Sequence, residues 1–247
     1  MARLSVNLNK IALLRNSRHT GVPDLAHFAE LALANGSKGL TIHPRPDERH
    51  IRGTDVPLLA AVLGARRPAM EFNIEGYPDD RLMKLITPAR PEQVTLVPDA
   101  PGAFTSEEGW HLDDAQSAVL AAYLPDIQAL GARCILFVDP DPDVVPKVKA
   151  AGADGIEIYT GHYAAAFRKG THAPILASIA ATAKAAKDLG LVVNAGHDLT
   201  LRNIPPLMQA VPFLAEASIG HELTADALER GFAATVQAYA KALDPRG

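Results

Sequence analysis

Short runs of apolar and β-branched residues recur along the chain, and each is followed by a segment with helical periodicity. Eight runs are expected to be strands: residues 4–9, 39–44, 69–75, 93–99, 133–139, 155–161, 191–197 and 216–222. The segments between them are rich in Ala, Leu, Lys and Glu. One keeps the i, i+3, i+4, i+7 spacing of an amphipathic helix with Leu176, Ile179, Ala180 and Ala183. The pattern therefore predicts strands and helices in regular alternation.

Residues that favour helix ends support this alternation. Helix starts are expected at Pro23-Asp24 and Thr54-Asp55, and helix ends at Gly36, Gly131, Gly152 and Gly190. Strand and helix repeated eight times predict a (β/α)₈ TIM barrel, formed as a single domain by residues 1–247. A doubly wound open sheet is the alternative, but it does not require eight units. The long connections at residues 99–132 and 161–190 are expected to hold extra helices.

Alternation within the strands places polar side chains inside this barrel. In residues 69–75, Phe72 and Ile74 share one face, while Glu71, Asn73 and Glu75 share the other. Helices cover the outside of a barrel, so the polar face must point inward. The same parity points these residues inward: Asn7, Asn9, Thr41, His43, Arg45 and Glu157. Burying unpaired charges costs several kcal/mol each, on the order given for ions in proteins, so we interpret this interior as an active site.

Composition narrows the function further. The chain is 48% hydrophobic and 21% charged with a net charge of -4, which gives no basic surface for nucleic acid or an anionic membrane. No apolar stretch is long enough to span a membrane. The single cysteine, Cys134, excludes an internal disulfide and fits a cytoplasmic location.

The histidines and lysines limit the possible chemistry. His19, His50, His111 and His162 lack the spacing of metal ligands, and no strand clearly points a lysine inward for a Schiff base. The glycines of "AGHD" (195–198) and "IGHE" (219–222) would let a phosphate approach backbone N–H groups at the ends of the last two strands. We therefore predict acid–base catalysis on phosphorylated carbonyl compounds, without a metal.

Seven motifs in order identify a family resemblance that covers essentially the whole chain. They are "VNLNKIALLRNSR" (6–18), "TIHPRPDERHI" (41–51), "EFNIEGYP" (71–78), "QVTLVPD" (93–99), "IEIYTG" (156–161), "VNAGHDLT" (193–200) and "SIGHE" (218–222). The chain resembles the pyridoxine 5′-phosphate synthase family. This resemblance implies the condensation of 3-amino-2-oxopropyl phosphate with 1-deoxy-D-xylulose 5-phosphate to pyridoxine 5′-phosphate, phosphate and water. It also implies that no metal or organic cofactor is needed, and that the chain forms a cytosolic homo-oligomer, typically an octamer.

The resemblance also assigns residues. The family's two proton acceptors fall on His43 and Glu71, its proton donor on His197, and a further active-site acid on Glu157. It assigns the amino ketone phosphate to Asn7, Arg18, Asp198, Gly220 and His221. It assigns the deoxyxylulose phosphate to Asn9, Lys10, Arg45, His50 and Thr105.

This sequence departs from the family pattern at two places, with Asn9-Lys10 in place of Asp-His and Asp198 in place of Gly. Two other functions remain as alternatives. One is another phosphate-binding barrel isomerase or aldolase, and the other is a non-catalytic protein that binds vitamin B6 phosphates.

Overall fold

Eight parallel strands close into a barrel in a computed structural model that describes residues 2–99, 106 and 108–244. The strands pair in sequence order, and β1 also pairs with β8. Their bounds are β1 Arg3–Asn7, β2 Gly39–Ile42, β3 Glu71–Gly76, β4 Gln93–Leu96, β5 Arg133–Val138, β6 Gly155–Tyr159, β7 Val192–Gly196 and β8 Glu216–Ile219. The predicted barrel is confirmed, and each strand begins and ends within three residues of its expected range.

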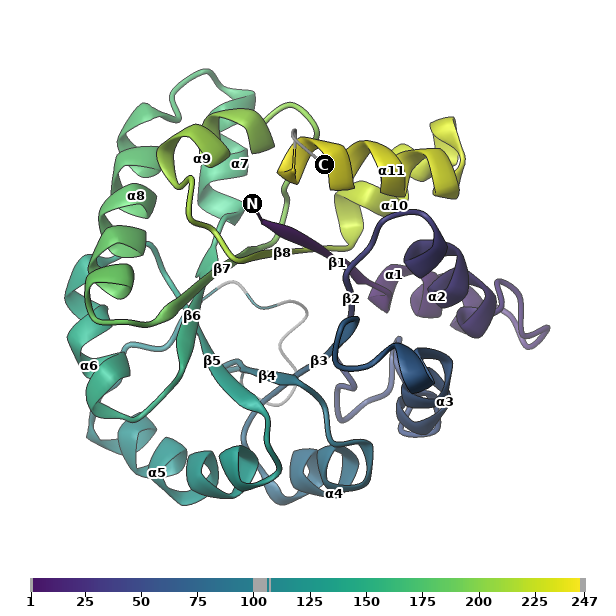
Figure 1. Ribbon diagram of the computed structural model, residues 1–247, viewed down its shortest axis with the longest axis horizontal. Coiled ribbons are helices and arrows are strands. Elements are labelled where there is room, and N and C mark those ends of the chain that lie inside the picture. Colours follow the sequence, from purple (N-terminus) through teal and green to yellow (C-terminus); the bar gives the residue numbers. More distant parts are fainter. Residues whose placement is uncertain (1, 100–105, 107, 245–247) are drawn as a thin grey trace.

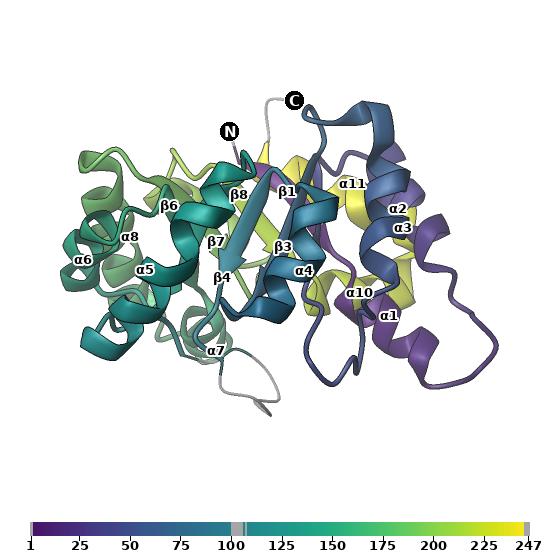
Figure 2. The same ribbon diagram turned by 90° about the horizontal axis from the view of Figure 1, so that it is seen from below.

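The helices form a ring around the barrel, which Figure 1 shows in a view along its axis. Their bounds are α1 Asn9–Asn16, α2 Leu25–Ala34, α3 Asp55–Leu63, α4 Asp80–Ala89, α5 Asp114–Ala129, α6 Val145–Ala150, α7 Gly161–Arg168, α8 Ala173–Asp188, α9 Ile204–Ala210, α10 His221–Arg230 and α11 Phe232–Leu243. Helices α1, α7 and α10, which directly follow β1, β6 and β8, lie at one end of the barrel (Figure 2).

In the described part of the chain, two α-helices instead of one follow each of β1, β6 and β8. The extra helix expected at residues 161–190 is α7, which precedes α8. In the connection from β4 to β5, the described residues before α5 (97–99, 106 and 108–113) are not helical, and the rest of the segment expected to hold an extra helix lies outside the described residues. Paired helices that we did not predict follow β1, as α1 and α2, and β8, as α10 and α11.

The expected helix ends are mostly confirmed. Asp24 caps α2 by accepting hydrogen bonds from the backbone N–H groups of Ala26 and His27. The four glycines expected to end helices all have positive φ, as glycine readily allows: Gly36, Gly131, Gly152 and Gly190. Thr54 departs from expectation, because its side chain makes no capping hydrogen bond and its backbone is already helical.

The strands separate an apolar outer layer from a largely polar interior, as parity predicted. Outward residues such as Leu40, Ile42, Phe72 and Ile74 are completely buried against the helices. The interior also contains an apolar cluster of Val97, Phe137 and Tyr159.

The polar interior residues fall at two distinct levels along the barrel axis. Glu71 begins β3 and Glu75 lies four residues later on the same face. A rise of about 3.3 Å per residue places them roughly 13 Å apart along the strand. Strand alternation therefore predicted correctly which side chains point into the barrel. The structure shows that these inward charges do not all lie at one end of the barrel.

Candidate active site

A cavity of about 530 Å³ opens at the end of the barrel where the strands finish. This is the face that carries the active sites of such barrels, and the volume suits small phosphorylated molecules. Most of the predicted site residues line this cavity: Asn7, Asn9, Lys10, His43, Arg45, His50, His197, Asp198, Gly220 and His221.

His43 and Glu75 form a buried pair in the cavity wall. His43 Nδ1 lies 3.8 Å from Glu75 Oε2, and Asn7 Nδ2 donates a long hydrogen bond of 3.4 Å to the same oxygen. Burial lowers the pKa of His43, and the nearby Arg45 lowers it further. Burial raises the pKa of Glu75 to about 7. Near neutral pH the pair therefore contains a neutral imidazole and a carboxyl group that can either take or give a proton.

Glu157 lies deeper in the barrel, below the turn that carries His197. A Cβ atom on Gly196 would lie 2.1 Å from Glu157 Oε1, so only glycine at position 196 leaves room for this side chain. Burial and then the nearby carboxyl groups of Glu75 and Glu216 raise the pKa of Glu157 well above its usual value. Its Oε2 atom has no hydrogen-bond partner among the described residues. Burial without a partner therefore favours the protonated, uncharged form of the Glu157 carboxyl group.

Glu71, to which the family resemblance assigns a role as proton acceptor, does not line this cavity. It lies at the opposite end of the barrel and forms ion pairs with Arg3 and Arg133. Burial would raise its pKa, but the hydrogen bonds from Arg133 and Arg3 outweigh burial and lower it. A carboxylate held by two guanidinium groups is a poor proton acceptor. The geometry assigns Glu71 to the ionic network at the base of the barrel.

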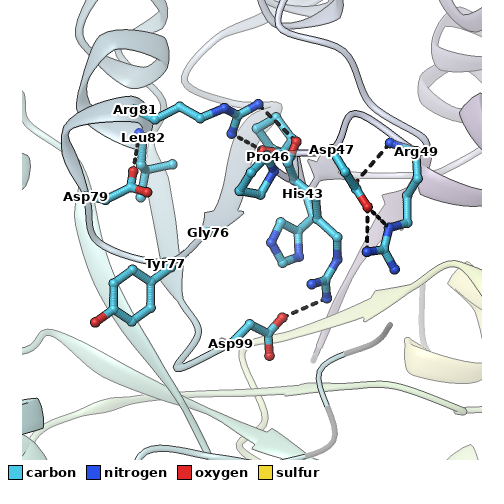
Figure 3. A pocket seen from close by; sticks show the side chains of 12 residues that line it. His43, Pro46, Asp47, Arg49, Gly76, Tyr77, Asp79, Arg81, Leu82 and Asp99 are labelled. Atoms are coloured by element: carbon cyan, nitrogen blue, oxygen red, sulfur yellow. Dashed lines mark hydrogen bonds and ion pairs between the residues drawn. The ribbon is translucent and has the colours of Figure 1, made fainter. Parts of the chain in front are cut away.

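Arg45 is held in place by acceptors from the segment after β4. Its guanidinium donates to Asp99 Oδ2 at 2.6 Å and to Ser106 Oγ at 3.2 Å, and Ser106 Oγ also bonds Asp99 Oδ2. Figure 3 shows Asp99 facing this guanidinium beside His43. The arrangement orients a cation toward the cavity while its charge is balanced.

Arg81, from α4, supports the loop that carries His43 and Arg45. Its guanidinium donates to the backbone carbonyl oxygens of Pro44 at 2.5 Å and Arg45 at 3.0 Å. Figure 3 shows dashed lines from the Arg81 guanidinium to this loop. Arg81 also lines a smaller pocket that shares His43 and Arg45 with the main cavity. Arg81 thus fixes the backbone on which both functional side chains stand.

His50 lines the cavity as a side chain that is uncharged at neutral pH. Its Nδ1 accepts a hydrogen bond from the N–H of Ile51 at 2.9 Å. Burial lowers the pKa of His50 to about 4, and the charge of Arg45 contributes to this shift. His50 can donate a hydrogen bond to a phosphate through Nε2, but it does not contribute a positive charge at neutral pH.

The segment after β1 differs locally from the expected extended strand. The strand ends at Asn7, and both Asn9 and Lys10 belong to the first turn of α1. Asn9 Oδ1 accepts a hydrogen bond from the backbone N–H of His43 at 2.9 Å. Lys10 therefore lies on a helix, and it lines the cavity.

The ends of β7 and β8 bring backbone close to the cavity. A Cβ atom on Gly220 would lie 3.0 Å from Cβ of Asn7, so a larger residue would be crowded there. Helix α10 begins at His221, so its first N–H groups lie beside this glycine, where an anion is favoured. His197 and Asp198 both have positive φ, at 77° and 57°. Aspartate tolerates this conformation, which glycine adopts freely, and this fits the departure from the family pattern at position 198.

Two predicted ligands are not placed in the cavity. Arg18 is exposed after the end of α1 and does not line it. Thr105 lies outside the described residues. The residue assignments made from the sequence left out Arg49, Ser106 and Ser218, which line the cavity. Strand parity pointed Glu75 into the barrel without giving it a role, and Asp99 was only the last residue of the expected strand 93–99. Of these, Ser218 could have been found by its inward parity on β8.

Two searches of the described part of the chain bear on cofactors and membranes. Within it, no group of three or more His, Cys, Asp or Glu side chains is arranged to hold a metal ion. No helix in that part is both long and apolar enough to cross a membrane.

Comparison with solved structures supports the fold. Tryptophan synthase from M. tuberculosis has a TM-score of 0.65 at 12% identity, with 98% of this chain and 92% of that chain covered. Phosphoribosyl anthranilate isomerase from Thermotoga maritima has a TM-score of 0.60 at 11% identity, with 99% and 100% covered. At such low identity the similarity establishes the barrel fold alone.

Comparison with protein families is more specific. The family model for "Pyridoxal phosphate biosynthesis protein PdxJ" matches residues 4–245. Pyridoxine 5′-phosphate synthase of Allorhizobium ampelinum is 51% identical over 244 residues, which cover 98% of this chain and 97% of that protein. The enzyme of the same name from Agrobacterium fabrum is 50% identical over 249 residues, with 99% and 98% covered. The chain therefore belongs to the PdxJ family, together with the pyridoxine 5′-phosphate synthases.

Proposed function

We propose that this chain is a pyridoxine 5′-phosphate synthase, which condenses 3-amino-2-oxopropyl phosphate with 1-deoxy-D-xylulose 5-phosphate. The products are pyridoxine 5′-phosphate, inorganic phosphate and water. Family membership supports this activity, and so does a cavity that combines proton-transfer groups with anion-binding groups.

The pairing of His43 with Glu75 is the observation that carries the proposal. Imine formation, enolisation, elimination and ring closure each move a proton, and groups with a pKa near the working pH do this best. Neutral His43 accepts a proton from the substrate, and Glu75, with a pKa of about 7, exchanges protons with it over a short distance. The second proton acceptor is thus Glu75, in place of the Glu71 that the resemblance suggested.

His197 and Glu157 complete the proton-transfer groups. The imidazole of His197 lies against the rings of Phe137 and Tyr159, with ring centroids 5.1 Å and 5.5 Å away. Burial lowers the pKa of His197, so its imidazole is neutral at neutral pH. It first accepts a proton and then, as the imidazolium, gives that proton to the leaving group in the late steps. Glu157 lies below His197 in the barrel, and its raised pKa lets it hold a proton that can replace the one given by His197.

Two phosphate positions follow from the distribution of donors. The position for the deoxyxylulose phosphate lies on the β1–β2 side of the cavity. Its donors are the Arg45 guanidinium, the Lys10 ammonium, the His50 imidazole and the Asn9 side chain. The backbone at Gly220 and His221, with Asn7 and Asp198, lies around the start of α10 and suits the amino ketone phosphate. Arg18 is exposed and does not line the cavity of a single chain, so we assign it to neither phosphate position.

The direct test is to incubate the purified chain with both substrates and to follow phosphate and pyridoxine 5′-phosphate together. We expect the two products in equal amounts and neither product when one substrate is omitted. Release of phosphate from one substrate alone would indicate a different phosphate-binding enzyme. Binding of pyridoxine 5′-phosphate without any turnover would indicate a binding protein.

We also propose that the chain works as a cytoplasmic homo-octamer. Helices α1 and α10 contact each other and carry the exposed apolar side chains of Leu13, Leu14 and Leu228. These side chains support an interface between copies of the chain at this surface. Sedimentation of the purified chain tests the assembly, because a monomer at micromolar concentration would contradict it.

A further inference from the structure

The turn after β7 holds two consecutive residues in a conformation that side chains disfavour. His197 has φ of 77° and Asp198 has φ of 57°, and neither is glycine. Residues in this region persist only where surrounding contacts hold them, and such residues are concentrated at functional sites. The contacts that hold this turn therefore determine where the His197 imidazole points.

Thr160 makes the first of these contacts from the end of β6. Its side chain is completely buried, and its Oγ1 contacts the carbonyl oxygens of both Gly196, at 2.6 Å, and His197. The Gly196 oxygen also accepts the backbone N–H of Thr160 at 3.0 Å. A hydroxyl has a single proton to donate. The Gly196 carbonyl already accepts a hydrogen bond from the backbone N–H of Thr160, so the Thr160 hydroxyl can donate its proton to the carbonyl of His197.

Asn203 makes the second contact from the start of α9. It is 2% exposed, and its Nδ2 donates to the carbonyl oxygen of Asp198 at 3.1 Å. Its Oδ1 accepts the backbone N–H of Thr200 at 2.7 Å. Its own carbonyl oxygen accepts the hydroxyl of Tyr163, on α7, at 2.7 Å. The amide side chain of Asn203 thus closes the loop from Asp198 to Thr200, and its backbone carbonyl ties this loop to the neighbouring helix α7.

The carbonyl groups of both strained residues are therefore held by buried side chains from outside the turn. If either donor is lost, the peptide can rotate toward an ordinary conformation, and the imidazole leaves its place between Phe137 and Tyr159. We propose that Thr160 and Asn203 are positioning residues for the reaction, because they hold the strained turn that aims His197 and places Asp198 at the cavity wall. This inference rests on the proposed function only through the role given to His197.

Paired variants separate the hydroxyl of Thr160 from its shape. Thr160→Val keeps the branched shape without a donor, and Thr160→Ser keeps the donor without the methyl group. We expect Thr160→Val to lower kcat by about 10²-fold, the scale for a misplaced catalytic group, with little change in either KM. We expect Thr160→Ser to recover most of that loss.

The matched control is Thr182→Val in α8. Thr182 is also completely buried, and its hydroxyl also donates to a backbone carbonyl, that of Ser178 at 2.9 Å. This control should keep wild-type turnover. The proposal is overturned if Thr160→Val turns over like the control, or if Thr160→Ser is as impaired as Thr160→Val.

Asn203→Asp tests the second contact. The aspartate keeps the acceptor for Thr200 and removes the donor to Asp198, so we expect a loss of kcat similar to that of Thr160→Val. Asn35→Asp is its control, because Asn35 also donates through Nδ2 to a backbone carbonyl, that of Leu31, far from the cavity. Equal turnover in the two variants would remove Asn203 from the proposal.

A spectroscopic measurement tests the geometry without relying on activity. In the folded chain with labelled histidine, the imidazole signals of His197, assigned with a His197→Asn variant, report its contact with the two aromatic rings. We expect these signals to move in Thr160→Val and to stay in place in Thr182→Val. If the wild-type chain makes no pyridoxine 5′-phosphate, the proposed function fails while this measurement still decides on the turn. Unmoved signals in Thr160→Val would overturn the positioning role.

Discussion

His43 Nδ1 lies 3.8 Å from Oε2 of Glu75, and both side chains are buried at the end of the barrel where the strands finish. Burial shifts their pKa values in opposite directions, lowering that of His43 and raising that of Glu75 to about 7. A neutral base thus lies beside a carboxyl group that titrates at physiological pH. Proton transfer in the proposed reaction depends on this pair.

The first prediction concerns the pH dependence of activity. Glu75 must lose its proton to act as a base, so kcat/KM should fall as the pH is lowered through an apparent pKa near 7. Because the pKa of His43 is lowered, His43 remains neutral over this range and does not limit the rate. A pH–rate profile with both substrates checks this. An acidic limb only at the ordinary glutamate pKa would contradict the environment described for Glu75.

The second prediction concerns Lys10. Lys10→Met removes a charge at the start of α1 and should raise KM for deoxyxylulose phosphate about tenfold, while KM for the amino ketone phosphate stays nearly unchanged. The salt dependence of ketose capture should weaken as well. Lys84→Met on the exposed side of α4 is the control for net charge. If Lys10→Met behaves like this control, the ketose phosphate is held elsewhere.

The third prediction concerns Arg81. Arg81→Met removes both hydrogen bonds to the carbonyls of Pro44 and Arg45, so the loop carrying His43 should lose its fixed geometry. We expect kcat/KM to fall at least about tenfold, while the melting temperature falls only slightly because Arg81 is partly exposed. Arg81→Lys keeps the charge but not the planar fork and should recover little. Full activity in Arg81→Lys would show that charge alone matters.

The fourth prediction concerns stability at the base of the barrel. Burial raises the pKa of Glu216 to about 7, from the ordinary glutamate value of 4.5. Between these pH values the folded chain keeps a proton that the unfolded chain has released, so the free energy of unfolding falls as the pH rises through this window. Glu216→Gln should remove this loss and stabilise the chain at pH 8, by on the order of 1–3 kcal/mol, with no gain at pH 4.5.

Urea unfolding of this variant at both pH values measures the effect. Glu229→Gln, on the exposed end of α10, is the control for the loss of a carboxylate. If Glu216→Gln changed the free energy of unfolding equally at the two pH values, Glu216 would not be protonated in the folded chain.

The sequence determined the barrel but not the position of each charge within it. Alternation assigned Glu71 and Glu75 correctly to the inner face, because parity depends only on the order of residues along a strand. It did not show at which end each glutamate lies, since that depends on where β3 begins and how it pairs with β2 and β4. The motif "EFNIEGYP" contains both, and only the structure distinguishes the glutamate beside His43 from the one between Arg3 and Arg133.

Lys10 and His50 show two further limits. Strand alternation cannot predict the direction of the Lys10 side chain, because the strand ends at Asn7 and a helix begins two residues later. The charge of His50 could not be predicted because it depends on burial and on the arginine that folding brings near it. Local patterns thus predict elements and faces, while charge states depend on the packed structure.

The comparison of Glu75→Gln with Glu71→Gln tests the central claim most directly. The two changes are chemically identical, and they affect opposite ends of the same face of β3. In the assay of phosphate and pyridoxine 5′-phosphate, Glu75→Gln should lower kcat by about 10²–10⁴-fold with the fold retained, the usual range for the loss of a general acid–base group. Glu71→Gln should lower the melting temperature, because Arg3 and Arg133 lose their partner, yet keep turnover within about threefold of wild type. Near-normal turnover in Glu75→Gln, together with loss of turnover in a folded Glu71→Gln, would contradict the assignment of proton transfer to His43 and Glu75.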